Sequence, residues 1–383
     1  MRFTDIEDLR RHARRRVPKA IFDYVDGGSY TEAALRNNRT DLDRIRIVQR
    51  VLSDVTDRSQ ACPIFGETLS MPILISPTGL AGLVHPNGEV DAYRAATAAG
   101  TRYTLCTPSI SATDDLALAR APDAPPFWFQ IYVMKDRGFT EFLLDRARRA
   151  GCRTLVITLD LVVNAQRHRD TKNGLAIPFR ITPQTALDAL LKPGWFMRMT
   201  RSKRRSFGNF EGYPGLEGGV QSMAAWVAEQ YQPLLTAESI GWIRDIWEGP
   251  VVLKGIMTPE DARKAVDFGA DAIIVSNHGG RQLDAAPSPV SALPAIADAI
   301  KGEIPILADS GVRTGADVFR MIALGADACM IGRAHLYGLG AAGQAGVERA
   351  LEILRDELDV AMALAGCRTL ADIDTGTVIA APG

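Results

Sequence analysis

Short apolar segments recur along the chain, and each ends in a polar residue or a glycine. Their apolar residues are continuous rather than alternating, which is typical of strands buried on both faces. The pattern predicts eight strands, within residues 72–79, 102–109, 127–133, 154–160, 250–256, 271–278, 304–311 and 327–333.

Helical patterns lie between most of these segments, for example GEVDAYRAATAAG (88–100) and GFTEFLLDRARRAG (138–151). The glycine that closes each pattern is a common helix stop. Strands that alternate with helices indicate an α/β fold with a parallel sheet. Because the count is eight, we expect a closed (β/α)8 TIM barrel, and a doubly wound open sheet is the alternative.

Two segments fall outside this repeat. Residues 1–70 precede the first strand, and we expect them to form an N-terminal helical cap on a barrel of residues 71–383. Thr4 and Glu7 predict a capping box at the start of the first helix. Residues 161–249 separate the fourth and fifth strands, which is far longer than a usual loop. We expect residues 173–232 to be a mobile insertion over the barrel mouth, where barrel enzymes place active sites.

The composition narrows the class of protein. Of the 383 residues, 46% are hydrophobic. The formal net charge of -1 means that no overall electrostatic field attracts the protein to nucleic acid or to an anionic membrane. The five cysteines are scattered and form no CxxC pair, so we expect reduced thiols in a cytoplasmic protein, with no metal site. The first residues lack the apolar core of a signal peptide.

Glycine and arginine occur together after the last two predicted strands. The sequence ADSGVR supplies Gly311 and Arg313, and IGR supplies Gly332 and Arg333. Barrels commonly bind a phosphate between these two loops, with backbone amides and cations as partners. The alternative is that the glycines only form tight turns and that the arginines pair with acids.

Lys254 ends the otherwise apolar strand VVLK. A buried lysine needs an ionic partner or an electron-rich acceptor. It could form a Schiff base with a carbonyl substrate, or lie against the edge of a flavin. A structural ion pair explains Lys254 equally well when this residue is considered alone.

The sequence VSNHGGRQLD (275–284) joins a candidate base to a cation at the end of the sixth predicted strand. His278 can accept a proton, and Arg281 can hold a carboxylate by two parallel hydrogen bonds. Asp160 ends the fourth strand and could orient the imidazole. This set suits a substrate whose carboxylate lies next to the reacting carbon.

Two further patterns carry weaker signals. GLGAAG (338–343) matches a dinucleotide-binding fingerprint, but it follows the last strand and no strand–turn–helix unit surrounds it, so we do not expect a dinucleotide there. The basic and apolar segment WFMRMTRSKRRS (195–206) could dock on an anionic membrane surface or form a solvated loop, and we do not expect it to bind nucleic acid.

Several motifs together resemble the FMN-dependent L-2-hydroxy acid oxidising family, which includes glycolate oxidases, bacterial L-lactate dehydrogenases and (S)-mandelate dehydrogenases. The motifs are FDYVDGGSYTEAALRNN, WFQIYV, VVLKGI, SNHGGRQLD, ADSGVRTG and ALGADACMIGRAHLYGLG. The resemblance covers nearly the whole chain and is nearest to the lactate and mandelate dehydrogenases. It implies a TIM barrel with FMN at its mouth and, as assembly, a homotetramer.

The resemblance also implies roles for single residues. His278 resembles the family's base and Asp160 its partner. The residues similar to those that bind the substrate are Tyr24, Tyr132, Arg167 and Arg281, and Tyr132 and Arg281 are also counted as catalytic. Residues similar to the family's FMN contacts are Pro77, Thr78, Gly79, Cys106, Gln130, Thr158, Lys254, Ser276, Asp309, Gly311, Arg313, Gly332 and Arg333.

Three positions depart from the oxidases of this family. Gly79 stands where many have alanine, Cys106 where serine is common, and Pro108 where glycolate oxidases have tryptophan. We therefore expect the oxidation of an (S)-2-hydroxy acid with a quinone or cytochrome as electron acceptor. The alternatives are an oxidase that reduces O2 to H2O2, a lysine Schiff-base aldolase and a non-catalytic flavin-binding protein. We expect a cytoplasmic protein that can contact the inner face of the cell membrane through residues 195–206.

Overall fold

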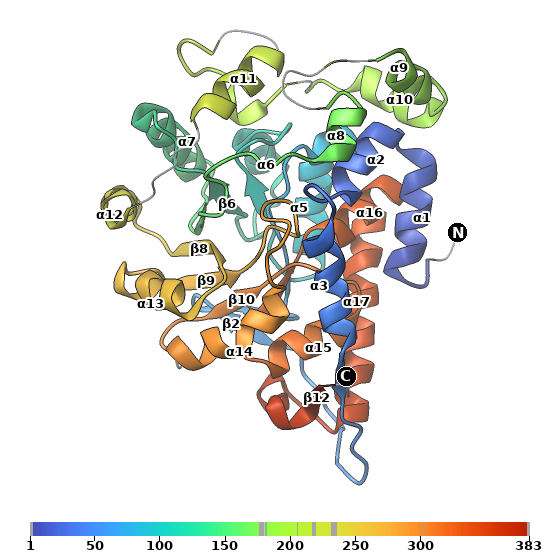
Figure 1. Cartoon of the computed structure of the whole chain (residues 1–383), viewed down its shortest axis with the longest axis vertical. Helices are drawn as coiled ribbons and strands as arrows, with labels where there is room; N and C mark the ends of the chain where they lie inside the picture. Colours follow the sequence, from blue (N-terminus) through green and yellow to red (C-terminus); the bar gives the residue numbers. More distant parts are fainter. Residues whose placement is uncertain are drawn as a thin grey trace.

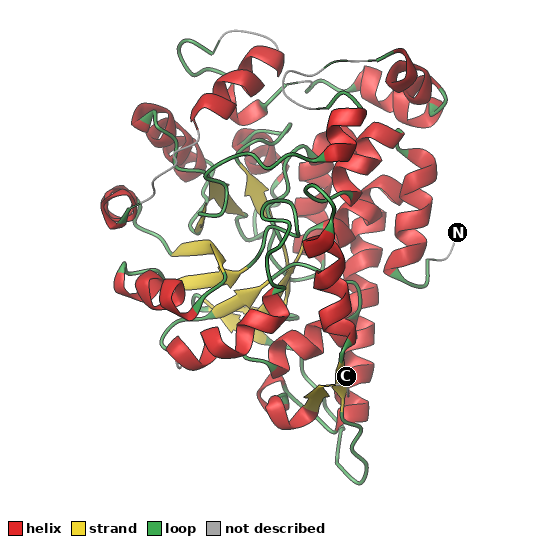
Figure 2. Ribbon diagram, in the orientation of Figure 1, coloured by secondary structure: helices red, strands yellow, loops and turns green. Residues whose placement is uncertain are grey.

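Eight parallel strands form the centre of the molecule, and they appear as the yellow arrows in Figure 2. The computed structural model describes residues 3–175, 180, 182–204, 206–216, 220–230, 236–300 and 302–380. The strands follow one another in the order β4-β11-β10-β9-β8-β7-β6-β5, and a bridge between Ile75 and Tyr103 joins β4 to β5. The sheet is therefore closed, and the predicted TIM barrel is confirmed.

Each strand lies inside one of the predicted apolar segments. The segments are apolar because the strand side chains are buried on both faces of the sheet. The barrel strands are β4 (Ile73–Ile75), β5 (Thr104–Cys106), β6 (Trp128–Ile131), β7 (Leu155–Thr158), β8 (Val251–Ile256), β9 (Ala272–Val275), β10 (Ile306–Ala308) and β11 (Ala328–Ile331). Alternate side chains such as Leu74, Val156 and Leu307 form one buried cluster, as expected for a filled barrel interior.

Helices surround the barrel and follow the strands in chain order (Figure 1). They are α4 (Ala81–Val84), α5 (Gly88–Ala98), α6 (Thr113–Ala119), α7 (Arg137–Arg149), α13 (Pro259–Asp267), α14 (Pro289–Ile300), α15 (Gly315–Ala323), α16 (Arg333–Ala342) and α17 (Gln344–Ala365). The sequence GLGAAG belongs to the end of α16 and the residue that follows it. Two short 3-10 helices, η2 (Leu370–Asp372) and η3 (Thr375–Thr377), lead to the last strand.

The N-terminal 70 residues are only partly helical. They contain α1 (Ile6–Arg16), α2 (Lys19–Asp26) and α3 (Ala33–Asp43), followed by β1 (Ile45–Ile47), β2 (Cys62–Ile64) and β3 (Glu67–Leu69). β1 pairs with β12 (Val378–Ala380) near the C-terminus, and β2 and β3 form a hairpin. Buried side chains of this hairpin join the barrel's interior cluster, so the hairpin packs against the barrel core. The segment expected to form a helical cap therefore contains three helices and also three short strands.

The capping box at the first helix was also placed one residue too early. Asp5 is the N-cap of α1, and its side chain accepts a hydrogen bond from the amide of Asp8. Thr4 donates to the Asp8 carboxylate at 2.6 Å. The Asp8 carboxylate therefore has the capping role that the sequence pattern assigned to Glu7.

Much of the described part of the long segment after β7 is helical. It contains α8 (His168–Lys172), α9 (Pro183–Leu190), α10 (Pro193–Arg201), η1 (Gly208–Phe210), α11 (Val220–Gln230) and α12 (Ala237–Ile246). α9 and α10 lie together at the top right of Figure 1, α11 lies at the top to their left, and α9 contacts α2. Trp195 of α10 donates to the carbonyl of Leu83 at 2.9 Å. The mobility of this long segment stays a prediction, but its helices α9 and α10 contact the body of the protein.

The buried carboxylate of Asp26, at the end of α2, connects four parts of the chain. It accepts hydrogen bonds from Arg10 of α1 at 2.7 and 2.9 Å, from Tyr337 of α16 at 2.7 Å and from Arg169 of α8 at 3.3 Å. Burial raises its pKa, but the hydrogen bonds from Arg10 and Tyr337 outweigh burial and hold the pKa at about 2. Asp26 is thus charged at neutral pH and joins the N-terminal helices to the barrel.

Candidate active site

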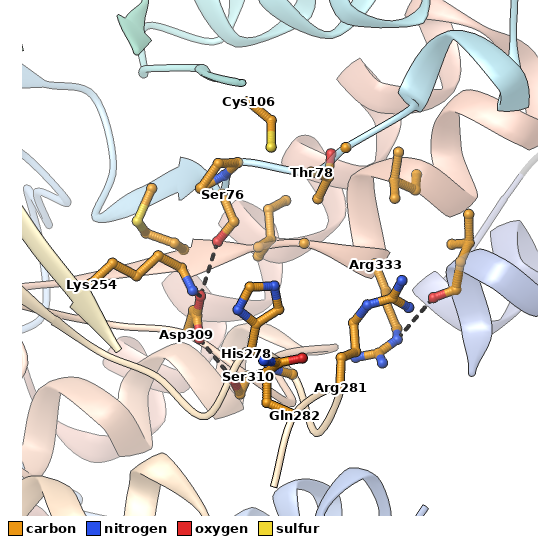
Figure 3. A pocket seen from close by; sticks show the side chains of 18 of the residues that line it. Ser76, Thr78, Cys106, Lys254, His278, Arg281, Gln282, Asp309, Ser310 and Arg333 are labelled. Carbon is orange, nitrogen blue, oxygen red and sulfur yellow. Dashed lines mark hydrogen bonds and ion pairs between the residues drawn. The ribbon is translucent and has the colours of Figure 1, made fainter. Parts of the chain in front are cut away.

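One cavity lies at the carboxyl ends of the barrel strands (Figure 3). Loops after several strands and the C-terminal end of α2 form its walls. The residues that were predicted as site residues and line this cavity are Tyr24, Pro77, Thr78, Gly79, Cys106, Tyr132, Arg167, Lys254, His278, Arg281, Asp309, Gly311, Arg313, Gly332 and Arg333. The barrel thus brings together residues from distant parts of the chain.

The four remaining predicted residues lie just outside the cavity lining. Asp160 contacts His278, and Ser276 accepts a hydrogen bond from Lys254 at 2.8 Å. Gln130 is fully buried in β6, and Thr158 ends β7 beside Lys254 in the sheet. The structure therefore places these side chains behind the lining.

His278 sits on an unusual backbone turn. Its φ is +57°, and Gly279 and Gly280 follow with φ of +68° and +70°. The left-handed conformation costs a non-glycine residue about 1 kcal/mol, so tertiary contacts must hold it. The amide of His278 donates to Ser276 at 3.1 Å, and the ring nitrogen Nδ1 lies 2.8 Å from Asp160 Oδ1. This contact leaves Nε2 available to a ligand.

Asp160 is buried beside His278. Burial raises the pKa of Asp160, but the charges of His278 and Lys254 outweigh burial and lower the pKa below its ordinary value. Its second carboxylate oxygen is buried without a hydrogen-bond partner in the described part of the chain. A charged carboxylate at this position can orient the imidazole and stabilise its protonated form.

Lys254 is buried in an ion pair. Its Nζ lies 3.3 Å from Asp309 Oδ2 and donates to Ser276. Burial lowers the pKa of Lys254, but the charges of Asp309 and Asp160 raise it above its ordinary value. A Schiff-base lysine needs a lowered pKa to become a nucleophile. The site therefore disfavours the aldolase alternative.

Three guanidinium groups at the cavity make no ion pair with a carboxylate among the described residues. Arg281 donates to the carbonyls of Tyr24 and Gly27, at 2.6 and 3.2 Å. Arg333 donates to those of Val25 and Gly27, at 3.0 and 2.8 Å. The guanidinium of Arg313 donates to the carbonyl of its neighbour, Val312, and lies over the Tyr337 ring. The alternative in which the arginines at the last two loops pair with acids was wrong.

Burial changes the pKa of two of these guanidinium groups. It lowers the pKa of Arg281 to about 9 and that of Arg333 to about 10, because water solvates the guanidinium groups poorly there. Both stay charged at neutral pH. Arg167 and Arg281 both lie over the Tyr24 ring, with 5.2 and 4.9 Å between guanidinium carbon and ring centre. The cavity can therefore attract two anionic groups, one near Tyr24 and one near Arg313 and Arg333.

The buried side-chain amide of Gln130 contains a hydrogen-bond donor that has no partner among the described residues. Its Oε1 accepts hydrogen bonds from Cys106 Sγ at 3.0 Å and from the Thr107 amide at 3.2 Å. Its Nε2 is buried and has no hydrogen-bond partner in the described part of the chain. A buried unpaired donor costs about 1–3 kcal/mol, which a ligand with an acceptor atom recovers.

The sequence analysis missed several residues of this site. Ser76 and Ser310 donate to Asp309 at 3.4 and 2.7 Å, and Gln282 lines the cavity while donating to the carbonyls of Asp160 and Val163. Ser310 and Gln282 each lie next to a predicted site residue in the sequence, which was a usable signal. Ser76 carried the same signal, because it lies just after β4 and next to the predicted residue Pro77.

The TIM barrel, the positively charged cavity at its mouth and the Gln130 donor that has no partner among the described residues fit an enzyme that binds flavin mononucleotide. Comparison with known proteins supports this. A family model described as FMN-dependent dehydrogenase matches residues 13–380. The chain belongs to this family, and it is an FMN-dependent 2-hydroxy acid dehydrogenase.

Similar proteins carry two kinds of name. L-lactate dehydrogenase of Pseudomonas aeruginosa (strain LESB58) is 46% identical over 97% of this chain and 97% of its own length. That of Haemophilus influenzae (strain PittEE) is also 46% identical, again over 97% of both chains. A crystal structure of (S)-mandelate dehydrogenase, described as a monotopic membrane protein, is 35% identical with a TM-score of 0.92, over 99% of this chain and 100% of that chain.

A mandelate oxidase is also similar in structure. It is 38% identical with a TM-score of 0.81, and the match covers 97% of this chain and 96% of that chain. Dehydrogenases and oxidases therefore share this architecture, so the fold leaves the electron acceptor open. Within the described residues of the present chain, no helix is long and apolar enough to cross a membrane.

The turn that holds His278 yields a testable prediction. A Cβ at Gly280 would lie 2.5 Å from the backbone nitrogen of Leu35, in addition to the strain of its positive φ. Gly280→Ala should therefore lower the free energy of unfolding by about 2 kcal/mol or more, measured by urea denaturation. Gly269→Ala is the control, because its φ is +75° and no atom lies within 4 Å of the added Cβ. Equal losses in the two variants would show that the close approach to Leu35 has no effect.

Proposed function

We propose that this enzyme oxidises an (S)-2-hydroxy acid, such as L-lactate or (S)-mandelate, to the 2-oxo acid and passes the electrons to a quinone or cytochrome. The observation that carries this proposal is the pairing of His278 with Asp160 beside Arg281. A base and a guanidinium that has no carboxylate partner among the described residues meet the needs of a substrate with a hydroxyl group next to a carboxylate.

Arg281 and Arg167 would bind the substrate carboxylate, and the phenols of Tyr24 and Tyr132 would contact the carboxylate and the hydroxyl. All four line the cavity. Arg281 is held at the backbone of α2, so its orientation is preorganised and little entropy is lost on binding. Replacing the planar guanidinium by an ammonium group would keep the charge and lose the two parallel hydrogen bonds.

His278 would accept the proton of the substrate hydroxyl at Nε2. Asp160 holds Nδ1 and would stabilise the imidazolium that results. The cavity lies inside the barrel mouth, where the low dielectric strengthens both interactions. The chain thus provides the base, its orienting acid and the carboxylate clamp.

FMN would supply the two-electron acceptor of the reaction. Arg313, Arg333 and the amides of Gly311 and Gly332 would hold its phosphate, and Asp309 its ribityl chain. Lys254 would stabilise negative charge on the reduced ring. The other proposed contacts to FMN are Pro77, Thr78, Gly79, Cys106, Gln130, Thr158 and Ser276. What supports this set is the excess of positive charge and the unpaired Gln130 donor.

Substitution of the proposed base tests this function. His278→Gln should still bind FMN but reduce it more slowly by about four orders of magnitude, because proton transfer and substrate orientation are lost together. The measurement is anaerobic bleaching of the flavin by L-lactate and by (S)-mandelate. His12→Gln, on α1 outside the cavity, is the matched control and should reduce FMN at the normal rate. A His278→Gln enzyme that keeps a tenth of the normal rate would remove His278 from the mechanism.

The electron acceptor is the part of the proposal that divides a dehydrogenase from an oxidase. Gly79 lies in the cavity wall next to Pro108 and Tyr24, and a Cβ there would meet Pro108 at 3.4 Å and Tyr24 Oη at 3.5 Å. These are contacts that the site can accept. An alanine would therefore fill space at the cavity wall without displacing the backbone.

We expect substrate-reduced enzyme to reoxidise slowly in air and quickly with a soluble quinone. Gly79→Ala should narrow the gap between the two rates, because an added methyl changes access to the cavity and the stability of the reduced anion. Stopped-flow absorbance measures both rates, and Gly241→Ala, whose Cβ would meet no atom within 4 Å, is the control. Reoxidation of the wild type in air at the rate of turnover would make the enzyme an oxidase.

A second proposal concerns the location of the enzyme. We propose peripheral membrane contact through α9 and α10, because large apolar side chains are exposed there. Those side chains are Leu187, Leu190, Leu191, Phe196 and Met197. The expected basic patch is smaller than its sequence suggests, since Arg204 pairs with Asp115 and Glu211. Arg205 lies outside the described residues, while Arg201 and Lys203 are exposed.

Vesicle sedimentation tests this contact. The wild type should sediment with anionic phospholipid vesicles at low salt, and Leu190→Asp/Leu191→Asp should reduce the bound fraction about tenfold or more, because burial of two leucines is lost. Leu118→Asp, at a more exposed site on α6, is the control. High salt should weaken binding only in part, since the remaining bases contribute at most about 1 kcal/mol each. Wild-type protein that stays in the supernatant at low salt would contradict the membrane proposal.

A further inference from the structure

The segment inserted after β7 reaches the wall of the cofactor cavity through Asn209. This residue of η1 is buried, with 1% of its surface exposed. Its Nδ2 donates to the carbonyls of Cys106 and Thr107, at 3.2 and 3.1 Å, and to Ser109 Oγ at 2.8 Å. Its Oδ1 accepts from the amide of Thr113 at 2.9 Å. One side chain thus binds the segment from the end of β5 to the start of α6 at four points.

Neighbouring contacts fix Asn209 in place. Arg146 of α7 donates to the carbonyls of Gly208, Asn209 and Glu211, at 3.1, 3.0 and 3.0 Å. The Gly208 amide donates to the carbonyl of Ser109 at 3.1 Å. A Cβ at Gly208 would lie 2.6 Å from a backbone oxygen of the same loop, so the two segments are in close backbone contact. The position of Asn209 is therefore determined from both sides.

The loop that Asn209 holds in turn orients Gln130. The Thr107 amide and Cys106 Sγ both donate to Gln130 Oε1, and Thr107 Oγ1 donates to the Gln130 carbonyl at 2.7 Å. Because two donors occupy Oε1, the amide plane of Gln130 is defined and Nε2 must point away from them. That Nε2 is the buried donor without a partner among the described residues.

We propose that Asn209 is a positioning residue for the cofactor. It fixes the Cys106–Thr107 backbone, which sets the Gln130 amide so that Nε2 donates to an acceptor atom of bound FMN. The proposal rests on the assignment of Gln130 to the FMN site. It makes residues 208–211 part of the cofactor site, although they lie far along the chain from every residue that was predicted to contact FMN.

A double-mutant cycle tests this relay, with FMN affinity as the readout. Apoprotein is titrated with FMN, and the quenching of flavin fluorescence gives the dissociation constant. Asn209→Ala and Gln130→Ala should each weaken FMN binding about 5- to 20-fold. The double variant should bind FMN no more weakly than Gln130→Ala alone, because both substitutions remove the same contact. The absorption spectrum of bound FMN should change in the same way in Asn209→Ala and Gln130→Ala.

The matched control is Asn173→Ala. Asn173 belongs to the same inserted segment, but its Nδ2 donates to Asp23 rather than to the cavity wall. This variant should keep the FMN dissociation constant within about twofold of the wild type. A tenfold loss in Asn173→Ala would show that any damage to the insertion weakens FMN, and it would overturn the relay.

Other outcomes also decide the question. Additive losses in the double variant, or an Asn209→Ala protein with normal affinity and spectrum but a lowered melting temperature, would make Asn209 a structural residue only. If Asn209→Ala does not fold, Asn209→Ser, which keeps one donor, must show the same non-additivity. If Gln130→Ala binds FMN normally, the assignment of Gln130 in the proposed function fails. Additivity between two variants that both weaken FMN binding overturns the relay alone.

Discussion

Hydrogen bonds between the C-terminal end of α2 and two arginines of the barrel organise the whole site. The last turn of a helix leaves carbonyl groups without partners, and these carry partial negative charge. Here Arg281 and Arg333 satisfy the carbonyls of Tyr24, Val25 and Gly27. The same bonds dock α2 on the barrel, and within the part of the chain that the structure describes neither guanidinium group has a carboxylate partner. Their charge is therefore available to ligands, which a salt bridge would have neutralised.

Two acids of the site pair with a histidine and a lysine, whereas Asp170 pairs with Arg167 at 2.8 Å. Asp160 pairs with His278, and Asp309 pairs with Lys254. Each pair joins residues from different strands or strand ends, which the parallel sheet brings within hydrogen-bond distance. The left-handed turn at His278 has its cost offset by close packing of Gly280 on α3 and by the bonds to Ser276 and Asp160. Strain and charge are thus concentrated at the residues that are proposed to do the chemistry.

The long segment after β7 contributes both to the proposed membrane contact and to the proposed support of the cofactor site. Its helices α9 and α10 carry exposed apolar side chains, whereas its 3-10 helix packs against the loop that supports Gln130. Similar enzymes include an (S)-mandelate dehydrogenase described as a monotopic membrane protein and a mandelate oxidase. In this chain the exposed outer part of the segment is the proposed membrane contact, while Asn209 and Phe210 are buried.

Local patterns in the sequence determined the strands, because a strand buried on both faces must be apolar along its whole length. They also determined which residues end those strands, and His278, Lys254, Arg313 and Arg333 all line the cavity as expected. The sequence predicted Asp160 as the partner of His278, but no local pattern predicted the partners of Lys254, Arg313 and Arg333. The carbonyls of α2, the β2–β3 hairpin at the core and the contact from Asn209 to Thr107 join segments far apart in the chain. Such contacts depend on how the elements pack in three dimensions, so only the tertiary structure decided them.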